Sequence, residues 1–462
     1  MIEATFTPIR AGEYRSAGGP WSGPSLDALL GPDPDVAAIA GGLRALGVHA
    51  GAVVTWRSPN RREVALAYRA CWRIGAIAAP VHHQFGDAEA AALVARLAPT
   101  ATLDLDALPR AVPVDAPWDD NESLAAVLFT SGSSGTPKGA LHTQATLAYK
   151  ASMMRDVHRI TSDDVVLMPA PCAHISGLLN GVTLPAIAGA RTVFMARWDP
   201  ERALDLIEAE GVTFMIGPPT FFVSLMGAAG FTSERVRSLR LVSSGGAGVT
   251  PAFVERAREL LGARVKRTYG STEAPTVATS TAADDETHDA THDGRAIGAV
   301  ELTLAPDGEL LVRGPEVCVG YIDPSATAAA FDRDGRFHTG DLATIDPDGW
   351  LTIVGRKHDV IIRGGENIAA AEIEAALESH PAVRCAAVIG EPDDRLGERV
   401  CAAIVTDGSP FDVALARSWF AERGLARYKV PERIEIVDAL PLLASGKPDK
   451  ARLRTLLLRA RS

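Results

Sequence analysis

Helix-like and strand-like segments alternate from about residue 36 to residue 270, which limits the folds open to this chain. Apolar residues recur with helical spacing in some segments, and short runs rich in Val, Ile and Leu lie between them. Such alternation predicts an α/β architecture with largely parallel sheets. The predicted helices cover residues 36–46, 62–74, 88–97, 200–210, 218–229 and 251–261, and the predicted strands cover residues 52–56, 76–81, 124–129, 212–217, 239–243 and 264–269.

The pattern changes after residue 298. Residues 298–355 contain short strand-like runs broken by two Pro-Asp-Gly turns, which predicts a small antiparallel barrel or sheet. The last hundred residues mix helical and strand-like segments and are long enough for a separate α+β domain. We therefore expect an N-terminal domain over residues 1–356 and a C-terminal domain over residues 357–462.

Composition excludes several classes of protein. The 462 residues carry a net charge of −11, which argues against non-specific binding to nucleic acid or to anionic membranes. No apolar run reaches the roughly 18 to 20 uncharged residues that span a bilayer. The five cysteines are scattered and never spaced as CxxC, as expected of reduced thiols. These features predict a soluble cytoplasmic protein without integral membrane association.

A loop rich in Ser, Thr and Gly follows the predicted strand at residues 124–129. Residues 130–139 read Thr-Ser-Gly-Ser-Ser-Gly-Thr-Pro-Lys-Gly, and a predicted helix follows at residues 143–150. Glycines let backbone N–H groups turn inward, hydroxyls add donors, and Lys138 adds a positive charge, so the loop suits a phosphate chain. The Walker A loop is the obvious rival, but it needs Gly before and Ser or Thr after its lysine, whereas Lys138 lies between Pro137 and Gly139.

Four further motifs follow this loop in order. They are Tyr-Gly-Ser-Thr-Glu at residues 269–273, His-Thr-Gly-Asp at 338–341 with Gly-Arg at 355–356, Gly-Gly-Glu-Asn at 364–367, and Ser-Gly-Lys at 445–447. Together with the loop they resemble the adenylate-forming superfamily, and among its members most closely the acyl-CoA synthetases. The resemblance covers roughly residues 36–450. It implies a large N-terminal domain of two α/β subdomains plus a small β-barrel-like subdomain, followed by a smaller, mobile α+β C-terminal domain.

The resemblance implies roles for residues around ATP. Thr272 would contact the α-phosphate, and Glu273 would hold Mg²⁺, for which a carboxylate is a suitable hard ligand. Asp341 would accept hydrogen bonds from both ribose hydroxyls, and Arg356 would reach the same ribose. The implied ATP- or AMP-binding residues are Thr130, Ser131, Gly132, Ser133, Ser134, Gly135, Thr136, Lys138, Gly245, Gly246, Ala247, Tyr269, Gly270, Ser271, Thr272, Asp341, Ile353 and Arg356.

The C-terminal motifs imply the remaining chemistry. Lys447 would be the catalytic cation, because negative charge spreads over the phosphorus oxygens when a carboxylate displaces pyrophosphate from ATP. Thr272 and Glu273 would act with it. Gly364 and Gly365 would let the narrow pantetheine arm of coenzyme A pass, and Arg363 could meet its phosphates. The interdomain hinge of the family would fall on His358.

The acyl pocket implied by the resemblance is mostly apolar. Its residues are His174, Ile175, Leu178, Ile216, Phe221 and Thr276. Residues 170–186 contain no aspartate to pair with an α-amino group and no arginine for a second carboxylate. The pocket therefore suits a hydrophobic monocarboxylate, whether fatty, alicyclic or aromatic.

These motifs predict an AMP- and pyrophosphate-forming acid–CoA ligase that uses ATP, Mg²⁺ and coenzyme A and, as is common among such enzymes, forms a homodimer. The C-terminal domain would rotate between adenylation and thioester formation. One alternative is a free-standing enzyme that loads the phosphopantetheine of a carrier protein, since it would share every motif. Another is a non-catalytic nucleotide-binding relative, against which the intact Lys138, Glu273, Asp341 and Lys447 speak.

Overall fold

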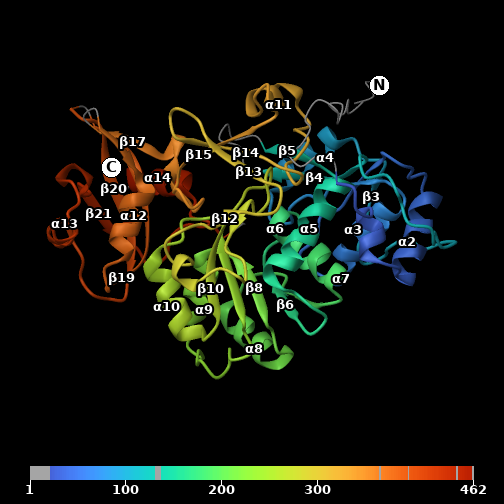
Figure 1. Cartoon of the computed structure of the whole chain (residues 1–462), viewed down its shortest axis with the longest axis horizontal. Coiled ribbons are helices and arrows are strands. Elements are labelled where there is room, and N and C mark those ends of the chain that lie inside the picture. The colour runs from blue at the N-terminus through green and yellow to red at the C-terminus, as the bar shows by residue number, and fades with distance from the viewer. Residues whose placement is uncertain (1–20, 131–136, 364–365, 394, 444–445, 460–462) are drawn as a thin grey trace.

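The computed structural model describes residues 21–130, 137–363, 366–393, 395–443 and 446–459. Two α/β units, a smaller antiparallel sheet and a C-terminal α+β unit follow one another along the chain (Figure 1). In the described part of the chain, no helix is both long and apolar enough to cross a bilayer.

A five-stranded sheet forms the first α/β unit. Its strand order is β3-β1-β2-β4-β5, with the first four strands parallel and β5 antiparallel to β4. Its core includes the rings of Trp56, Tyr68 and Trp72, whose successive centroids lie 4.9 and 5.3 Å apart. The elements are α1 (Leu26–Leu30), α2 (Pro34–Ala45), β1 (Val53–Thr55), α3 (Arg62–Arg73), β2 (Ile77–Ala78), α4 (Asp87–Leu97), β3 (Ala101–Thr102), β4 (Leu124–Thr130), β5 (Lys138–Thr143) and α5 (Gln144–His158).

The strand β5 corrects one expectation. The sequence predicts a helix from residue 143 and no strand before it, but residues 138–143 return along β4 as a strand, with Thr130 opposite Lys138. A Cβ at position 139 would lie 2.4 Å from the end of the Ile322 side chain, so glycine there leaves room for Ile322 to pack against this strand. The helix α5 starts only at Gln144, where the Thr143 hydroxyl accepts a hydrogen bond from the Thr146 backbone N–H.

A seven-stranded sheet forms the second α/β unit. Its order is β12-β11-β10-β9-β8-β6-β7, in which β10, β9, β8, β6 and β7 are parallel. The prediction of largely parallel sheets is therefore confirmed. The elements are β6 (Val165–Met168), α6 (Ile175–Gly177), a π-helix η1 (Leu178–Thr183), α7 (Leu184–Ala188), β7 (Arg191–Phe194), α8 (Pro200–Glu210), β8 (Phe214–Gly217), α9 (Pro219–Met226), β9 (Leu241–Gly245), α10 (Pro251–Leu261), β10 (Arg264–Tyr269), β11 (Ala278–Thr279), the 3₁₀ turn η2 (Glu286–His288) and β12 (Arg295–Ala296).

The register of the parallel strands sets the position of the site. Gly217 pairs with Ser244, and Gly245 pairs with Thr268, so β8, β9 and β10 end at the same edge. The loops that follow these carboxyl ends are where open α/β sheets bind ligands.

Residues 301–356 form a four-stranded antiparallel sheet in chain order. Both Pro-Asp-Gly turns join neighbouring strands, as predicted. The elements are β13 (Glu301–Leu304), β14 (Glu309–Arg313), α11 (Pro324–Ala330), β15 (Phe337–Ile345) and β16 (Leu351–Arg356).

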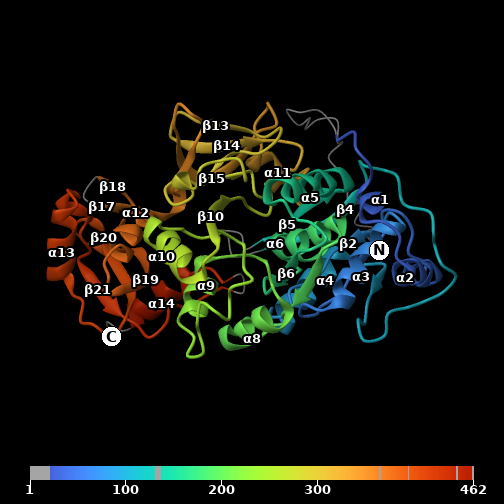
Figure 2. The same ribbon diagram turned by 60° about the horizontal axis from the view of Figure 1, so that its bottom comes forward.

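The C-terminal part has its own sheet and its own hydrophobic core. The order is β18-β17-β20-β19, and β21 pairs with β20. This part forms a separate body, drawn in orange and red, beside α9 and α10 in both views (Figures 1 and 2). The elements are the 3₁₀ turn η3 (Lys357–Asp359), β17 (Val360–Arg363), β18 (Glu366–Ala369), α12 (Ala370–Glu378), β19 (Val383–Asp393), β20 (Gly397–Thr406), α13 (Val413–Glu422), the 3₁₀ turn η4 (Arg427–Lys429), β21 (Arg433–Ile436) and α14 (Lys450–Arg459). A boundary between residues 356 and 357 stays our proposal, and it falls where β16 ends and η3 begins.

Candidate active site

The two ends of the phosphate loop lie side by side. Thr130 ends β4 and Lys138 begins β5, and the two residues are paired. The Lys138 ammonium lies 5.3 Å from the centre of the Tyr321 ring. The other predicted loop residues, Ser131, Gly132, Ser133, Ser134, Gly135 and Thr136, lie outside the described residues.

Two predicted site residues, Tyr269 and Arg356, both donate hydrogen bonds to the carboxylate of a third, Asp341. The Tyr269 hydroxyl donates to Oδ2 of Asp341 at 2.6 Å, and Nε of Arg356 donates to Oδ1 at 2.8 Å. The hairpin of β15 and β16 pairs Asp341 directly with Arg356, and Asp341 is buried. Burial and the neighbouring carboxylate both raise the pKa of Tyr269, so its hydroxyl stays a donor. The carboxylate is thus fixed in orientation, which a bidentate acceptor for two ribose hydroxyls requires.

The turn after β10 positions Ser271, Thr272 and Glu273. The Ser271 hydroxyl accepts from the backbone N–H of Ala274 at 3.1 Å, which closes the turn. The turn requires glycine at position 270, because a Cβ there would lie 2.1 Å from the backbone nitrogen of Thr276.

A buried histidine supports the same turn. Nε2 of His142 donates to the Thr272 carbonyl at 2.8 Å, and burial lowers the pKa of His142 to about 4. The imidazole is therefore neutral, and the proton lies on Nε2 to make this bond.

The donor set at Glu273 fits Mg²⁺. The Tyr321 hydroxyl donates to Oε1 of Glu273 at 2.7 Å and orients the half-buried carboxylate. In the described part of the chain, no group of three or more His, Cys, Asp or Glu side chains could hold a metal. One oriented carboxylate matches the way Mg²⁺ binds when substrate phosphates and waters supply most of its oxygen ligands.

Lys447 reaches this centre from the C-terminal part. Its Cε lies 3.2 Å from where a Cβ on Gly246 would stand, so Gly246, at φ +78°, leaves the lysine room. The Thr220 hydroxyl donates to the carbonyl of Gly446 at 2.7 Å and holds the lysine loop on α9. Burial and the Arg356 cation lower the pKa of Lys447 to about 8, against the opposing pull of Asp341 and Glu273. The ammonium is therefore close to Glu273 in the motif at residues 269–273 and to Asp341 in the motif at residues 338–341.

Of the remaining predicted nucleotide residues, Gly245 and Ala247 lie at the carboxyl end of β9, and Ile353 lies in the four-stranded sheet. Gly245 ends β9, and a Cβ there would lie 2.1 Å from the Thr268 carbonyl oxygen. Ala247 is half-buried two residues later. Ile353 lies in β16 and donates its backbone N–H to Asp293.

The predicted acyl residues are only partly brought together. His174 lies at the start of α6, and burial and the nearby Lys447 lower its pKa to about 4. Phe221 stacks on Trp198 at 4.5 Å and meets the Gly446 position. Thr276 has an unusual φ of +41°. Ile175 and Leu178 pack into the core of the first unit, and Ile216 packs into a neighbouring core.

Of the predicted coenzyme A residues, the structure describes Arg363. The Arg363 guanidinium pairs with Glu432 within the C-terminal part, through Nε and Oε1 at 2.6 Å. Gly364 and Gly365 lie outside the described residues.

Four residues at the site carry no signal that sequence reasoning recognised. They are His82, His142, Thr220 and Tyr321. Each lies outside the motifs and reaches the site from another element. A motif search therefore passes over them.

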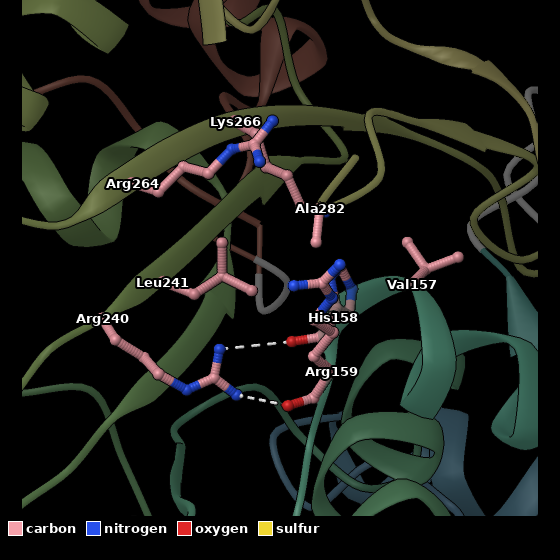
Figure 3. Close-up of a pocket in the computed structure, with 8 residues that line it drawn as sticks. All are labelled: Val157, His158, Arg159, Arg240, Leu241, Arg264, Lys266 and Ala282. Atoms are coloured by element: carbon pink, nitrogen blue, oxygen red, sulfur yellow. Dashed lines mark hydrogen bonds between the residues drawn. The ribbon is translucent and has the colours of Figure 1, made fainter. Parts of the chain in front are cut away.

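A pocket of about 220 Å³ lies at the opposite edge of the seven-stranded sheet, where β9 and β10 begin (Figure 3). Two of its three arginines have carboxylate partners, since Arg240 pairs with Asp164 and Arg264 pairs with Asp289. Arg240 donates to the carbonyls of His158 and Arg159, which caps α5, and pairs with Asp164. This pocket is separate from the candidate active site.

Comparison with known proteins identifies the family. The model of the family described as "AMP-binding enzyme" matches residues 33–111 and 94–322, and that of its C-terminal domain matches residues 372–447. The chain belongs to the AMP-binding enzyme family. The medium-chain fatty-acid–CoA ligase of Escherichia coli (strain K12) is 33% identical over 92% of this chain and 85% of its own. The indoleacetate–CoA ligase of Aromatoleum aromaticum is 32% identical over 91% of each chain.

The solved structures agree with this assignment. ATP-bound MatB from Rhodopseudomonas palustris superimposes with a TM-score of 0.81 at 28% identity, over 98% of each chain. The predicted adenylate-forming superfamily, fold class and enzyme class, an AMP-forming acid–thiol ligase, are confirmed. The roles of individual site residues stay predictions.

Proposed function

We propose that this AMP-binding enzyme is an ATP-dependent carboxylic acid–CoA ligase that acts on a hydrophobic monocarboxylate. The observation that carries the proposal is the position of Lys447, a cation from the C-terminal part, beside Gly246 and within the field of Asp341 and Glu273. The names of the two relatives, a fatty-acid and an indoleacetate ligase, support the substrate class and coenzyme A as the acceptor.

In the first step, an oxygen of the acid attacks the α-phosphorus of ATP, and pyrophosphate leaves. The Lys447 ammonium stabilises the charge that develops on the phosphorus oxygens. Asp341, held by Tyr269 and Arg356, accepts both ribose hydroxyls and fixes the nucleotide. Glu273 would hold Mg²⁺, which neutralises phosphate charge when bound.

In the second step, the sulfur of coenzyme A attacks the acyl carbonyl of the adenylate, and AMP leaves. Lys447 belongs to the first step only. We propose that the C-terminal domain rotates about residues 357–359 and presents Gly364, Gly365 and Arg363 in its place. A carrier-protein phosphopantetheine is the alternative acceptor, because its arm carries the same thiol.

The acid would lie between His174 and Phe221. Apolar neighbours favour a hydrocarbon body, and a neutral His174 adds no charge to it. Fatty, alicyclic and aromatic acids all fit this description.

The test is pyrophosphate release from ATP and Mg²⁺ across a panel of such acids, with and without coenzyme A. We expect acid-dependent release, with AMP and an acyl-CoA as products. Lys447→Ala should lower release at least about 100-fold, as removal of a transition-state contact typically does. Arg452→Ala, on the exposed face of α14, is the matched control. Release without acyl-CoA would favour the carrier-protein alternative, and full activity of Lys447→Ala would contradict the role of that lysine.

A further inference from the structure

His82 carries a buried N–H group without a partner in the described part of the chain. The residue follows β2 and is only 2% exposed. Its Nδ1 lies 3.1 Å from the backbone nitrogen of Gln84, and its Nε2 has no hydrogen-bond partner among the described residues. A backbone N–H can only donate, so Nδ1 accepts, and the proton of the neutral ring lies on Nε2.

The surroundings of His82 keep it neutral. Burial, together with His174, His83 and Arg57, lowers the pKa of His82 to about 3. When neutral, His174 and His83 each have an acceptor nitrogen, but Nε2 of His82 bonds to neither, and the Arg57 guanidinium can only donate. A buried donor without a partner is unfavourable, so a ligand oxygen that accepts a hydrogen bond from Nε2 would bind favourably.

The ring packs beside His174, a residue of the proposed acyl site. Its centroid is 4.9 Å from that of His174, which in turn feels the charge of Lys447. The side chain of Asn60, in the loop after β1, donates to the Ala170 carbonyl and accepts from the Cys172 N–H, and so it fixes the loop after β6 that carries His174. His82, in the loop after β2, therefore contacts His174, in the loop after β6.

We propose that His82 determines substrate specificity by donating its Nε2–H to a neutral oxygen on the body of the acid. The preferred substrates would then be hydrophobic acids with an oxo or hydroxyl group remote from the carboxylate, rather than plain hydrocarbons. This inference rests on the proposed function. It goes beyond the proposed function, because the apolar residues of the pocket by themselves would favour an acid with a plain hydrocarbon body.

The test compares matched acids. kcat/KM is measured by pyrophosphate release for 3-cyclohexylpropanoate and for its 3-oxo and 4-oxo ring derivatives. An oxo group only accepts hydrogen bonds, so it reports a protein donor. We expect at least one oxo acid to exceed the hydrocarbon by roughly tenfold, since the site's donor is left unpaired by the hydrocarbon.

Variants assign the preference to His82. His82→Phe keeps an aromatic ring but removes the donor, so the ratio of kcat/KM for the oxo acid to kcat/KM for the hydrocarbon should fall to about one. His82→Gln retains an N–H donor and should restore part of the preference. His83→Phe is the matched control, because the His83 ring stacks on that of His82 with centroids 4.9 Å apart but is half-exposed.

The outcomes separate the two proposals. A wild-type enzyme that turns over both acids equally, or an unchanged ratio in His82→Phe, would overturn the role of His82. The wild-type ratio decides this even where His82→Phe does not fold. Absence of turnover with every acid would instead contradict the proposed function.

Discussion

The ammonium of Lys447 stands between charges of opposite sign. Burial and Arg356 favour its neutral form, and Asp341 and Glu273 favour its charged form, with a resulting pKa of about 8. A lysine in this range is charged at neutral pH and can still respond to small changes nearby.

This balance predicts a pH dependence of adenylation. The cation is present below the lowered pKa and is lost above it, so kcat/KM for ATP should fall about tenfold per pH unit above pH 8. In Lys447→Arg, kcat/KM for ATP should be lower but independent of pH over this range, because a guanidinium stays protonated. Pyrophosphate release between pH 6 and 10 checks this. The same fall in Lys447→Arg would assign the titration to another group.

A buried ion pair supports the proposed acyl residue Thr276. Lys150 is fully buried, donates to the Thr276 carbonyl at 2.6 Å and lies 3.5 Å from Oε1 of the equally buried Glu316. Burial lowers the pKa of Lys150 and raises that of Glu316, while each charge opposes the other's shift. The contact fixes Thr276 at its positive φ.

Lys150→Met should lower the free energy of unfolding by about 3 to 5 kcal/mol, because it leaves Glu316 buried without its partner. The double variant Lys150→Met/Glu316→Leu should recover much of this loss, since neither charge then remains. Urea unfolding of both variants is the measurement. A loss below about 1 kcal/mol in the single variant would show that the pair behaves like an exposed one.

Single residues differ in how far the sequence reveals them. Asp341, Glu273 and Lys447 lie in motifs whose spacing can be read directly. Tyr269 and Arg356, which orient Asp341, also lie in motifs, but the partner of Glu273 cannot be read this way, because Tyr321 reaches Glu273 across 48 residues of chain. Such contacts depend on how loops from separate elements pack, and no local pattern encodes that packing.

At the scale of elements, the lysine loop rests on the start of α9. Gly446 has a φ of +81°, and a Cβ there would lie 2.9 Å from both Phe221 and Pro218. Together with the Thr220 hydrogen bond, this close approach brings Lys447 to the nucleotide site.

Gly446→Ala should therefore slow adenylation at least about tenfold, through backbone strain and the clash with α9. Thioester formation from added acyl-adenylate and coenzyme A should continue. Gly424→Ala is the matched control, since Gly424 has a φ of +67° but open space around it. Pyrophosphate release and thioester formation are measured separately. Equal loss of both steps would contradict a role in docking.

Most helices and strands could be predicted from the sequence, but β5 could not. Its six residues, Lys138–Thr143, are too short for a clear alternation and follow a glycine-rich loop. Pairing with β4 makes this segment a strand, and that is a tertiary contact rather than a local preference.

At the scale of the whole molecule, the C-terminal part packs against the second α/β unit through α12. Glu378 at the end of α12 faces the hydroxyl of Thr250 before α10 and accepts from the Ala386 N–H. Burial raises the pKa of Glu378 from 4.5 to about 8, opposed by those two bonds, and neighbouring Glu374 adds to the shift.

Docking of the two parts should therefore weaken as the pH rises from about 4.5 to about 8. The docked carboxyl keeps a proton that the released carboxyl gives up, so low pH favours docking. Small-angle scattering between pH 5 and 9 should show an expanding molecule. Glu378→Gln should remove the dependence, and an unchanged profile in this variant would exclude Glu378 as its origin.

Arg356 is the last residue of β16 and therefore the last before the proposed hinge. Its bond to Asp341 is made wholly on the N-terminal side of that hinge. In the swing that we propose for the C-terminal part, Lys447 would leave while Tyr269 and Arg356 keep their bonds to Asp341, the predicted ribose acceptor. AMP would thus remain tethered through both half-reactions, and its departure would come after pyrophosphate has already left. The order in which products leave would then follow from the position of one arginine.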